Sequence, residues 1–160
     1  MNKRIKKKHL KQENKKLCER YPFLIIRDWR TDKPIGYDFT YLDDMPMGWR
    51  KAFGEQMCEE IREELINYNY LDKYRIAQIK EKYGELRWYD FGAPADSKVY
   101  DIIDKYSELS KNTCIHCGRP ATKISPGWIS PYCDRCADRL SNTYDFAFQD
   151  IGELKSNGGN

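Results

Sequence analysis

The sequence predicts an α+β fold, in which a small antiparallel hairpin packs on a long helix and a compact cysteine-rich module follows at the C-terminal end. Two Cys-x2-Cys pairs, Cys114/Cys117 and Cys133/Cys136, are separated by fifteen residues. That spacing lets each pair supply two thiolates from a tight turn to one tetrahedral ion. We therefore interpret the module as a four-cysteine zinc ribbon with one structural Zn2+, and iron is the second metal that four thiolates accept.

An apolar repeat of four residues predicts the long helix. Its members are Trp49, Phe53, Met57, Ile61 and Leu65, and glutamates cover much of the remaining surface. Two aspartates and a proline within 43–46 form a helix-start signal. We interpret the aromatic and methionine stripe as core packing.

Strand-like runs at 74–80 and 86–91 flank a glycine turn and predict the hairpin. Ile76 falls on one face of the first strand, and Ala77 and Ile79 fall on the other. Both faces of the sheet are therefore expected to be partly apolar and covered. In the alternative interpretation, exposed aromatic residues of the hairpin, beside Arg75, Lys80 and Arg87, form a stacking platform for nucleic-acid bases.

Further elements complete the predicted order. A helix is expected over 3–20, which lacks Gly and Pro, and short strands are expected at 23–26 and 37–41. Val99, Ile102, Ile103, Tyr106 and Leu109 share a face and predict a helix that leads into the ribbon. Leu140, Tyr144, Phe148 and Ile151 recur at helical spacing and predict a C-terminal helix.

The chain length of 160 residues suits one conventional hydrophobic core with a small additional module held together by a metal ion. The predicted organisation is a basic N-terminal helix or arm (1–20), an α+β core (21–111), a zinc ribbon with its C-terminal helix (112–152) and a flexible tail (153–160). No apolar run is long enough for a membrane span or a secretory signal. Cys18 and Cys58 are expected to be reduced thiols, which fits a cytoplasmic protein.

Positive charge is concentrated at the N-terminus. Residues 1–20 hold nine Lys or Arg and two Glu, a net charge of +7, whereas the whole chain carries +3. A basic arm on a mildly acidic body favours binding to phosphate backbones or to an acidic protein surface, and a solvated helix is the alternative. The residues assigned to nucleic-acid or partner binding are Lys3, Arg4, Lys6, Lys7, Lys8 and Lys11 of the arm, and Arg119, Lys123, Arg135 and Arg139 of the ribbon.

Three stretches carry a resemblance: residues 48–54, residues 79–89 with the hairpin sequence KYGELRWY, and the two cysteine pairs with Gly127-Trp128 between them. Over about residues 20–140 the chain resembles uncharacterised zinc-ribbon proteins carried by phages and prophages. That family has no established activity to transfer. The resemblance implies an accessory protein in the cytoplasm of a bacterial host, where small phage proteins act on nucleic-acid machinery or on defences such as CRISPR effectors.

The motifs of zinc enzymes are absent from the sequence. A nucleobase deaminase needs a glutamate motif upstream of its second cysteine pair, but no Glu lies between Asn112 and Asp134. A His-Asn-His nuclease needs several histidines, and this chain has His9 and His116 alone. Four thiolates also leave no metal position open for water.

The sequence therefore predicts a non-catalytic zinc protein that binds nucleic acid or a nucleoprotein, and the resemblance to phage proteins implies a host target, with anti-CRISPR-like inhibition as the most specific form of this hypothesis. One alternative is a protein–protein adaptor or inhibitor that uses the acidic helix and the ribbon aromatics Trp128 and Tyr132. A zinc-dependent nucleic-acid enzyme is the other alternative. The oligomeric state is left open.

Overall fold

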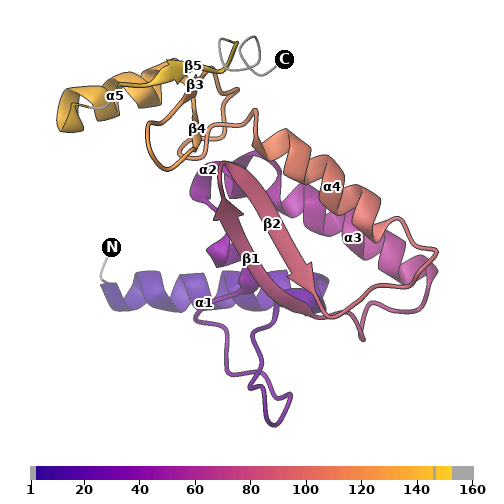
Figure 1. The fold of residues 1–160 in the computed structure, drawn as a ribbon. Helices are drawn as coiled ribbons and strands as arrows, with labels where there is room; N and C mark the ends of the chain where they lie inside the picture. Colours follow the sequence, from indigo (N-terminus) through magenta and orange to yellow (C-terminus); the bar gives the residue numbers. More distant parts are fainter. Residues whose placement is uncertain (1–2, 146, 153–160) are drawn as a thin grey trace.

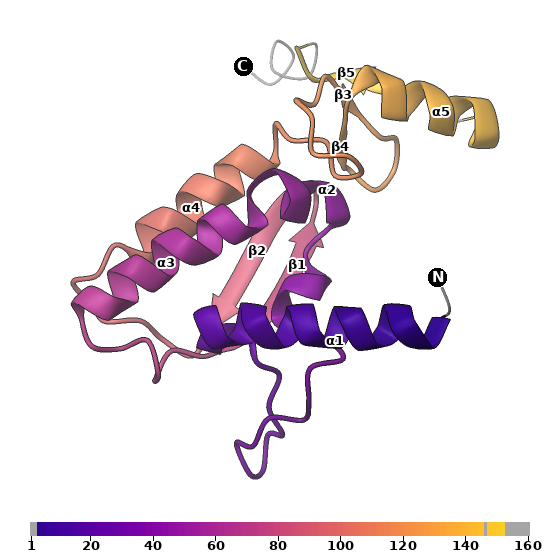
Figure 2. The same cartoon turned by 180° about the vertical axis from the view of Figure 1, so that it is seen from behind.

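A computed structural model describes residues 3–145 and 147–152 of the chain (Figure 1). The architecture is α+β, as predicted. A two-stranded hairpin lies against two neighbouring helices, α3 and α4, and a second small sheet with helix α5 forms a module beyond one end of the hairpin (Figures 1 and 2). No helix among the described residues is both long and apolar enough to span a bilayer.

Helix α1, Lys3–Arg20, confirms the predicted N-terminal helix. Its C-terminal half is anchored to the core, since Asn14 and Cys18 are buried and Asn14 Nδ2 donates to the carbonyl of Tyr37 at 3.0 Å. In its N-terminal half Ile5 and Leu10 are exposed. This half extends past the hairpin in both views (Figures 1 and 2).

The segment after α1 forms no strand at either predicted position. Pro22–Leu24 is a 3-10 helix, η1. Its Phe23 and Leu24 are buried in the core, so the apolar run is buried without forming a strand. A second 3-10 helix, η2, spans Tyr41–Asp44. Thr40 and Asp43 form a capping box there, because Asp43 Oδ2 accepts from the Thr40 backbone N–H at 2.6 Å and hydroxyl at 3.0 Å.

The predicted long helix follows as one path in three parts: α2 (Met47–Trp49), a π-helical turn η3 (Arg50–Gly54) and α3 (Glu55–Asn67). The four-residue stripe is confirmed as core, with Trp49, Phe53, Met57, Ile61 and Leu65 all buried. The wide turn was not predicted. π-Helical turns occur mostly as single insertions and are frequent at functional sites.

The hairpin is confirmed, with β1 at Ile76–Lys82 and β2 at Glu85–Asp90 paired antiparallel. Tyr83 and Gly84 make the turn with φ of 53° and 78°. A bulge between Ile76 and Gln78 puts Ile76 and Ile79 on the same buried side, while Ala77 is exposed. The expectation of two covered faces is therefore wrong, because the extra residue of the bulge changes the alternation.

Helix α4, Val99–Ser110, confirms the helix before the ribbon and packs on β2. Two serines join it to the strand. Ser110 Oγ accepts from the Leu86 backbone N–H at 2.8 Å, and Ser107 Oγ donates to the Leu86 carbonyl at 3.0 Å. These bonds satisfy the N–H and the carbonyl of Leu86 on the edge of β2 that does not face β1.

The C-terminal module contains β3 (Lys123–Ile124), β4 (Pro131–Tyr132), α5 (Asp134–Tyr144) and β5 (Gln149–Asp150), with sheet order β4-β3-β5. The C-terminal helix is confirmed as far as Tyr144. It ends at Asp145, which adopts φ 54°, and β5 then returns to pair with β3. The expected continuation through Phe148 and Ile151 is therefore wrong. The predicted tail, 153–160, lies outside the described residues.

Candidate metal centre and the basic recess beside it

The four predicted ligands come together in one cluster. The Sγ atoms of Cys114, Cys117, Cys133 and Cys136 all lie within 4.8 Å of one another, and those of Cys117 and Cys133 are 3.6 Å apart. All six cysteines of the chain are free thiols. Cys114, Cys133 and Cys136 are buried, so the cluster is closed on most sides.

These separations fit a tetrahedral thiolate site. Sulfurs about 2.3 Å from a zinc ion lie about 3.8 Å from one another, which agrees with the observed cluster. The four cysteines could therefore hold one metal ion, and four soft thiolate donors in this arrangement favour zinc or iron. A site closed by four protein ligands would staple the module together rather than activate a water molecule.

Each Cys-x2-Cys pair lies on a tight turn, which we call a knuckle: the first holds Cys114 and Cys117, and the second holds Cys133 and Cys136. Gly118 adopts φ 82°, and its N–H donates to the Cys114 carbonyl at 2.9 Å, which closes the first turn. In the second knuckle Cys133 is the N-terminal cap residue of α5, and its carbonyl accepts from the Cys136 N–H at 3.0 Å. Each pair thus presents two sulfurs from one tight turn, as the spacing predicted.

The first knuckle is docked on α2 by a close approach of backbones. The Gly48 N–H donates to the Ile115 carbonyl at 2.9 Å. A Cβ at Gly48 would lie 2.2 Å from the Cys114 carbonyl oxygen, and one at Gly118 would lie 2.6 Å from the Gly48 oxygen. The buried indole of Trp49 donates to the Thr113 carbonyl at 2.8 Å. The ribbon is therefore fixed to the core at this point.

A second contact joins the ribbon to the tip of the hairpin. The ring of Trp128 stacks on Tyr83, with 5.2 Å between centroids and 27° between planes, and its Nε1 donates to Glu81 at 2.7 Å. The other ribbon aromatic of the adaptor alternative, Tyr132, is half-buried and makes an edge contact with Phe148. Both aromatics thus have partners inside the chain.

Arg119 lies directly against the thiolates. Its Nε donates to Cys117 Sγ at 3.4 Å and its Nη2 to Cys133 Sγ at 3.3 Å. Although desolvation opposes ionisation of Cys117, hydrogen bonds from the Arg119 side chain and backbone lower the pKa of that thiol to about 6. The guanidinium therefore stabilises the ionised sulfur that a metal requires.

A basic recess of about 490 Å3 opens beside the cysteine cluster. It is lined by Lys51, His116, Cys117, Arg119, Arg135, Cys136 and Arg139, and none of these described lining residues is acidic. Nε2 of His116 lies 3.0 Å from Arg139 Nη2 and its Nδ1 lies 3.9 Å from Cys136 Sγ, so the imidazole forms the recess wall next to the four-sulfur cluster. We call this concave surface the basic recess.

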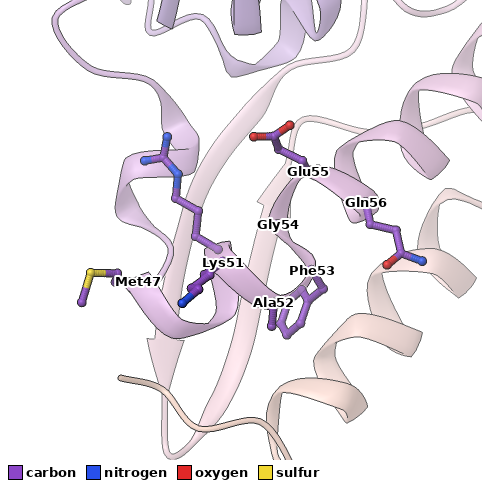
Figure 3. Close-up of a pocket in the computed structure, with 8 residues that line it drawn as sticks. Met47, Lys51, Ala52, Phe53, Gly54, Glu55 and Gln56 are labelled. Carbon is purple, nitrogen blue, oxygen red and sulfur yellow. The ribbon is translucent and has the colours of Figure 1, made fainter. Parts of the chain in front are cut away.

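The sequence did not point to Lys51, which the π-helical turn η3 brings to the recess. Figure 3 shows the side chains of this turn, where a hollow of about 340 Å3 is lined by Met47 and residues 50–56 alone. Ala52 lies next to Gly118, since a Cβ at that glycine would be 3.2 Å from the Ala52 Cβ. The wide turn thus packs against the first knuckle and leaves Lys51 at the rim. Lys51 lies close to Gly48 in the sequence, but no local pattern around these residues indicates a contact with cysteines more than sixty positions away.

The remaining predicted binding residues are dispersed. Lys123 pairs with Asp150 at 2.7 Å and is not among the residues that line the recess. On α1, Lys7 and Lys11 lie 3.8 and 3.6 Å from Asp38, and Lys6 and Lys8 are exposed. Lys3 and Arg4 belong to α1, and their side chains lie outside the described part of the chain.

No family model matches this chain, and neither a curated protein nor a solved structure gives a match.

Proposed function

We propose that this protein is a non-catalytic, zinc-binding accessory protein that binds the phosphate backbone of a nucleic acid, free or within a nucleoprotein. The observation that carries the proposal is the basic recess, in which Lys51, Arg119, Arg135 and Arg139 line one concavity without an acidic neighbour among its lining residues. Arginine and lysine side chains grouped on one concave surface are the electrostatic footprint of phosphate recognition.

The recess carries more positive charge than the metal–thiolate cluster needs for neutralisation, which supports a phosphate ligand. Four thiolates and one divalent zinc ion carry a net charge of about −2. Four cationic side chains line the recess, so they exceed that charge by about two. Arg119 is committed to the sulfurs by its hydrogen bonds. Arg139 contacts His116, and Lys51 and Arg135 remain for an anion.

Helix α1 supplies a second cationic surface for the same polyanion. In both views its N-terminal half and α5 extend past the hairpin towards the same side of the molecule (Figures 1 and 2). A nucleic-acid strand bound at the recess could therefore also contact α1 without crossing to the opposite side of the molecule. Contacts of this kind read phosphates and no sequence.

The non-catalytic part of the proposal is supported by the closed donor set, since a metal held by all four sulfurs has no position for a reacting water. The resemblance to phage zinc-ribbon proteins supports a host nucleoprotein, including a CRISPR effector, as the physiological target. An adaptor is less well supported, because Trp128 and Tyr132 contact residues of the same chain. On the acidic helix, Glu59 pairs with Arg20 and Glu60 with Lys105.

The recess is tested by the double variant Lys51→Gln/Arg135→Gln. Each lost phosphate contact should reduce the slope of log affinity against log salt by about 0.9 on duplex DNA, so the slope should flatten by about 1.8 for two contacts. The measurement is a binding titration at several salt concentrations. Lys73→Gln/Lys98→Gln is the control of equal charge, because Lys98 precedes α4 at the end remote from the ribbon (Figure 1). Equal slopes for the two double variants would remove the recess from the interface.

The arm is tested by deletion of residues 1–12, which removes six Lys or Arg residues and spares the buried anchors Asn14 and Cys18. If five of the removed cations contact phosphates, the slope on duplex DNA should fall by about 4 to 5. Thermal unfolding of the truncated protein should change little. An unchanged slope would mean that α1 is a solvated helix, and no binding by the intact protein at low salt would overturn the proposed function itself.

A further inference from the structure

Another pocket, of about 310 Å3, lies where the loop after α1 meets the outer end of the hairpin. Two of its lining rings, Trp29 and Phe91, are 84% and 80% exposed. Ile25, Tyr41 and Ile76 supply the rest of its apolar lining. The volume stands at the lower end of the range for ligand sites, about 300–1,000 Å3, and suits one small planar group. We call this concavity the aromatic pocket.

The ring of Trp29 is presented by an ordered turn. The Asp32 N–H donates to the Asp28 carbonyl at 2.9 Å and closes the turn around the tryptophan. The Asp32 carboxylate lies 3.8 Å from Arg27 and 3.6 Å from Arg75, and Arg75 directly precedes β1. The backbone that carries the exposed ring is therefore ordered before a ligand arrives, which reduces the entropy lost on binding.

The rim of the aromatic pocket carries both donors and acceptors. Arg27 and Arg75 provide guanidinium groups, and Asp28 and Asp32 provide carboxylates. Hydrogen bonds from the backbone and hydroxyl of Thr31 lower the pKa of Asp28, so its carboxylate is an acceptor at neutral pH. A nucleobase edge displays donors and acceptors together, as this rim does, with Asp32 already paired to Arg27 and Arg75.

Cations lie beside exposed aromatics at the pocket and at a separate hollow on α1, whose lining also includes Asp38. Arg30 places its guanidinium carbon 4.7 Å from the centroid of Trp29. On the limb of the loop that returns along α1, Phe39 is 69% exposed and lines a small hollow with Lys6 and Lys7. Basic side chains that follow a backbone, with aromatic faces between them for the bases, are typical of single-strand binding surfaces.

We propose that the aromatic pocket receives one unstacked base of a single-stranded nucleic acid, with Trp29 and Phe91 as the stacking surfaces and the cations of α1 on the adjoining phosphates. The inference rests on the proposed function and makes it more specific, because a paired base inside a duplex cannot enter the pocket. The rings act on bases, and the basic recess acts on phosphates. The two sites can therefore be tested separately.

The experiment compares a short oligothymidylate with an abasic phosphodiester chain of the same length, at one salt concentration, on the full chain and on Trp29→Ala. Stacking of one base on an aromatic side chain corresponds to about a tenfold change in affinity. Trp29→Ala should therefore weaken oligothymidylate binding about tenfold and leave abasic binding unchanged. Trp29→Phe keeps a ring and should restore most of the affinity, and Phe91→Ala should reproduce the loss.

The outcomes separate this inference from the proposed function. If the abasic chain binds as tightly as oligothymidylate and Trp29→Ala changes neither, the base site is overturned while phosphate binding stands, and the exposed rings would then suit a protein side chain. If neither chain binds the intact protein, both proposals fail. Because Trp29 is a surface side chain, Trp29→Ala should unfold at the same temperature as the parent, and a lowered temperature accompanied by unchanged oligothymidylate affinity would also count against the inference.

Discussion

Replacing Cys114 with serine is expected to release the metal and to unfold the C-terminal module while the core helix survives. Structural zinc contributes about 10–16 kcal/mol of binding free energy in zinc-finger peptides, and the small sheet of this module has little apolar core of its own. Hydrogen exchange should show loss of protection over residues 112–152. Protection should persist around Met57, Ile61 and Leu65, which are fully buried in the main core.

Cys18→Ser and Cys58→Ser are the matched controls for this change. Both thiols are buried in the main core, outside the four-sulfur cluster. Burial, with a smaller effect of Asp43, raises the pKa of Cys18 to about 11, so this thiol stays protonated and is a poor ligand. Elemental analysis should find one metal ion per chain in both controls and none in Cys114→Ser. Loss of metal from either control would show that the ligand assignment is wrong, and a red protein would identify the metal as iron.

Gly48→Ala is expected to cost more than about 3 kcal/mol of folding free energy or to separate the ribbon from α2. The new Cβ would lie 2.2 Å from the Cys114 carbonyl oxygen and 2.6 Å from that of Ile115. Both obstacles are backbone atoms, held in place by the first knuckle, and cannot move aside as a flexible side chain would. Thermal unfolding reports the change, and so does intrinsic tryptophan fluorescence, because Trp128 stacks on Tyr83 and Trp49 bonds to Thr113 at the docked interface.

Gly54→Ala is the control, because it adds the same methyl group to the same helical path. A Cβ there would meet its nearest neighbours at 3.4 Å, including side-chain atoms of Leu42 and Met45. Alanine also favours helix over glycine, so stability should change by less than about 1 kcal/mol. If Gly48→Ala unfolded at the same temperature as Gly54→Ala, the ribbon could not be docked on α2 in the way described.

The features that sequence reasoning predicted correctly are those decided by neighbours along the chain. Cys114 and Cys117 meet because one tight turn joins them, and Gly84 marks the hairpin turn because glycine adopts a positive φ readily. The helical stripe from Trp49 to Leu65 is likewise a local periodicity. Each of these patterns can be recognised within a window of a few residues.

The features that sequence reasoning missed depend on contacts between distant segments. The apolar run at Phe23 and Leu24 has the composition of a strand, but both side chains are buried from a 3-10 helix. The bulge after Ile76 inverts the facing of the strand and leaves no trace in composition. Lys51 reaches the recess only because α2 and the first knuckle meet, which no local pattern records.

The docking of the ribbon on α2 also imposes an order on maturation during synthesis. The bond between the Trp49 indole and the Thr113 carbonyl joins residues 64 positions apart. The Gly48 N–H likewise has its hydrogen-bond acceptor, the Ile115 carbonyl, only after that residue has been synthesised. Until the second cysteine pair has left the ribosome and a metal ion is captured, this side of α2 has no partner. With a metal ion held by the four sulfurs, metal supply would act as a checkpoint on the nascent chain. A metal-starved cell would accumulate chains with a folded core and an open α2 surface, a state that chaperones and proteases remove.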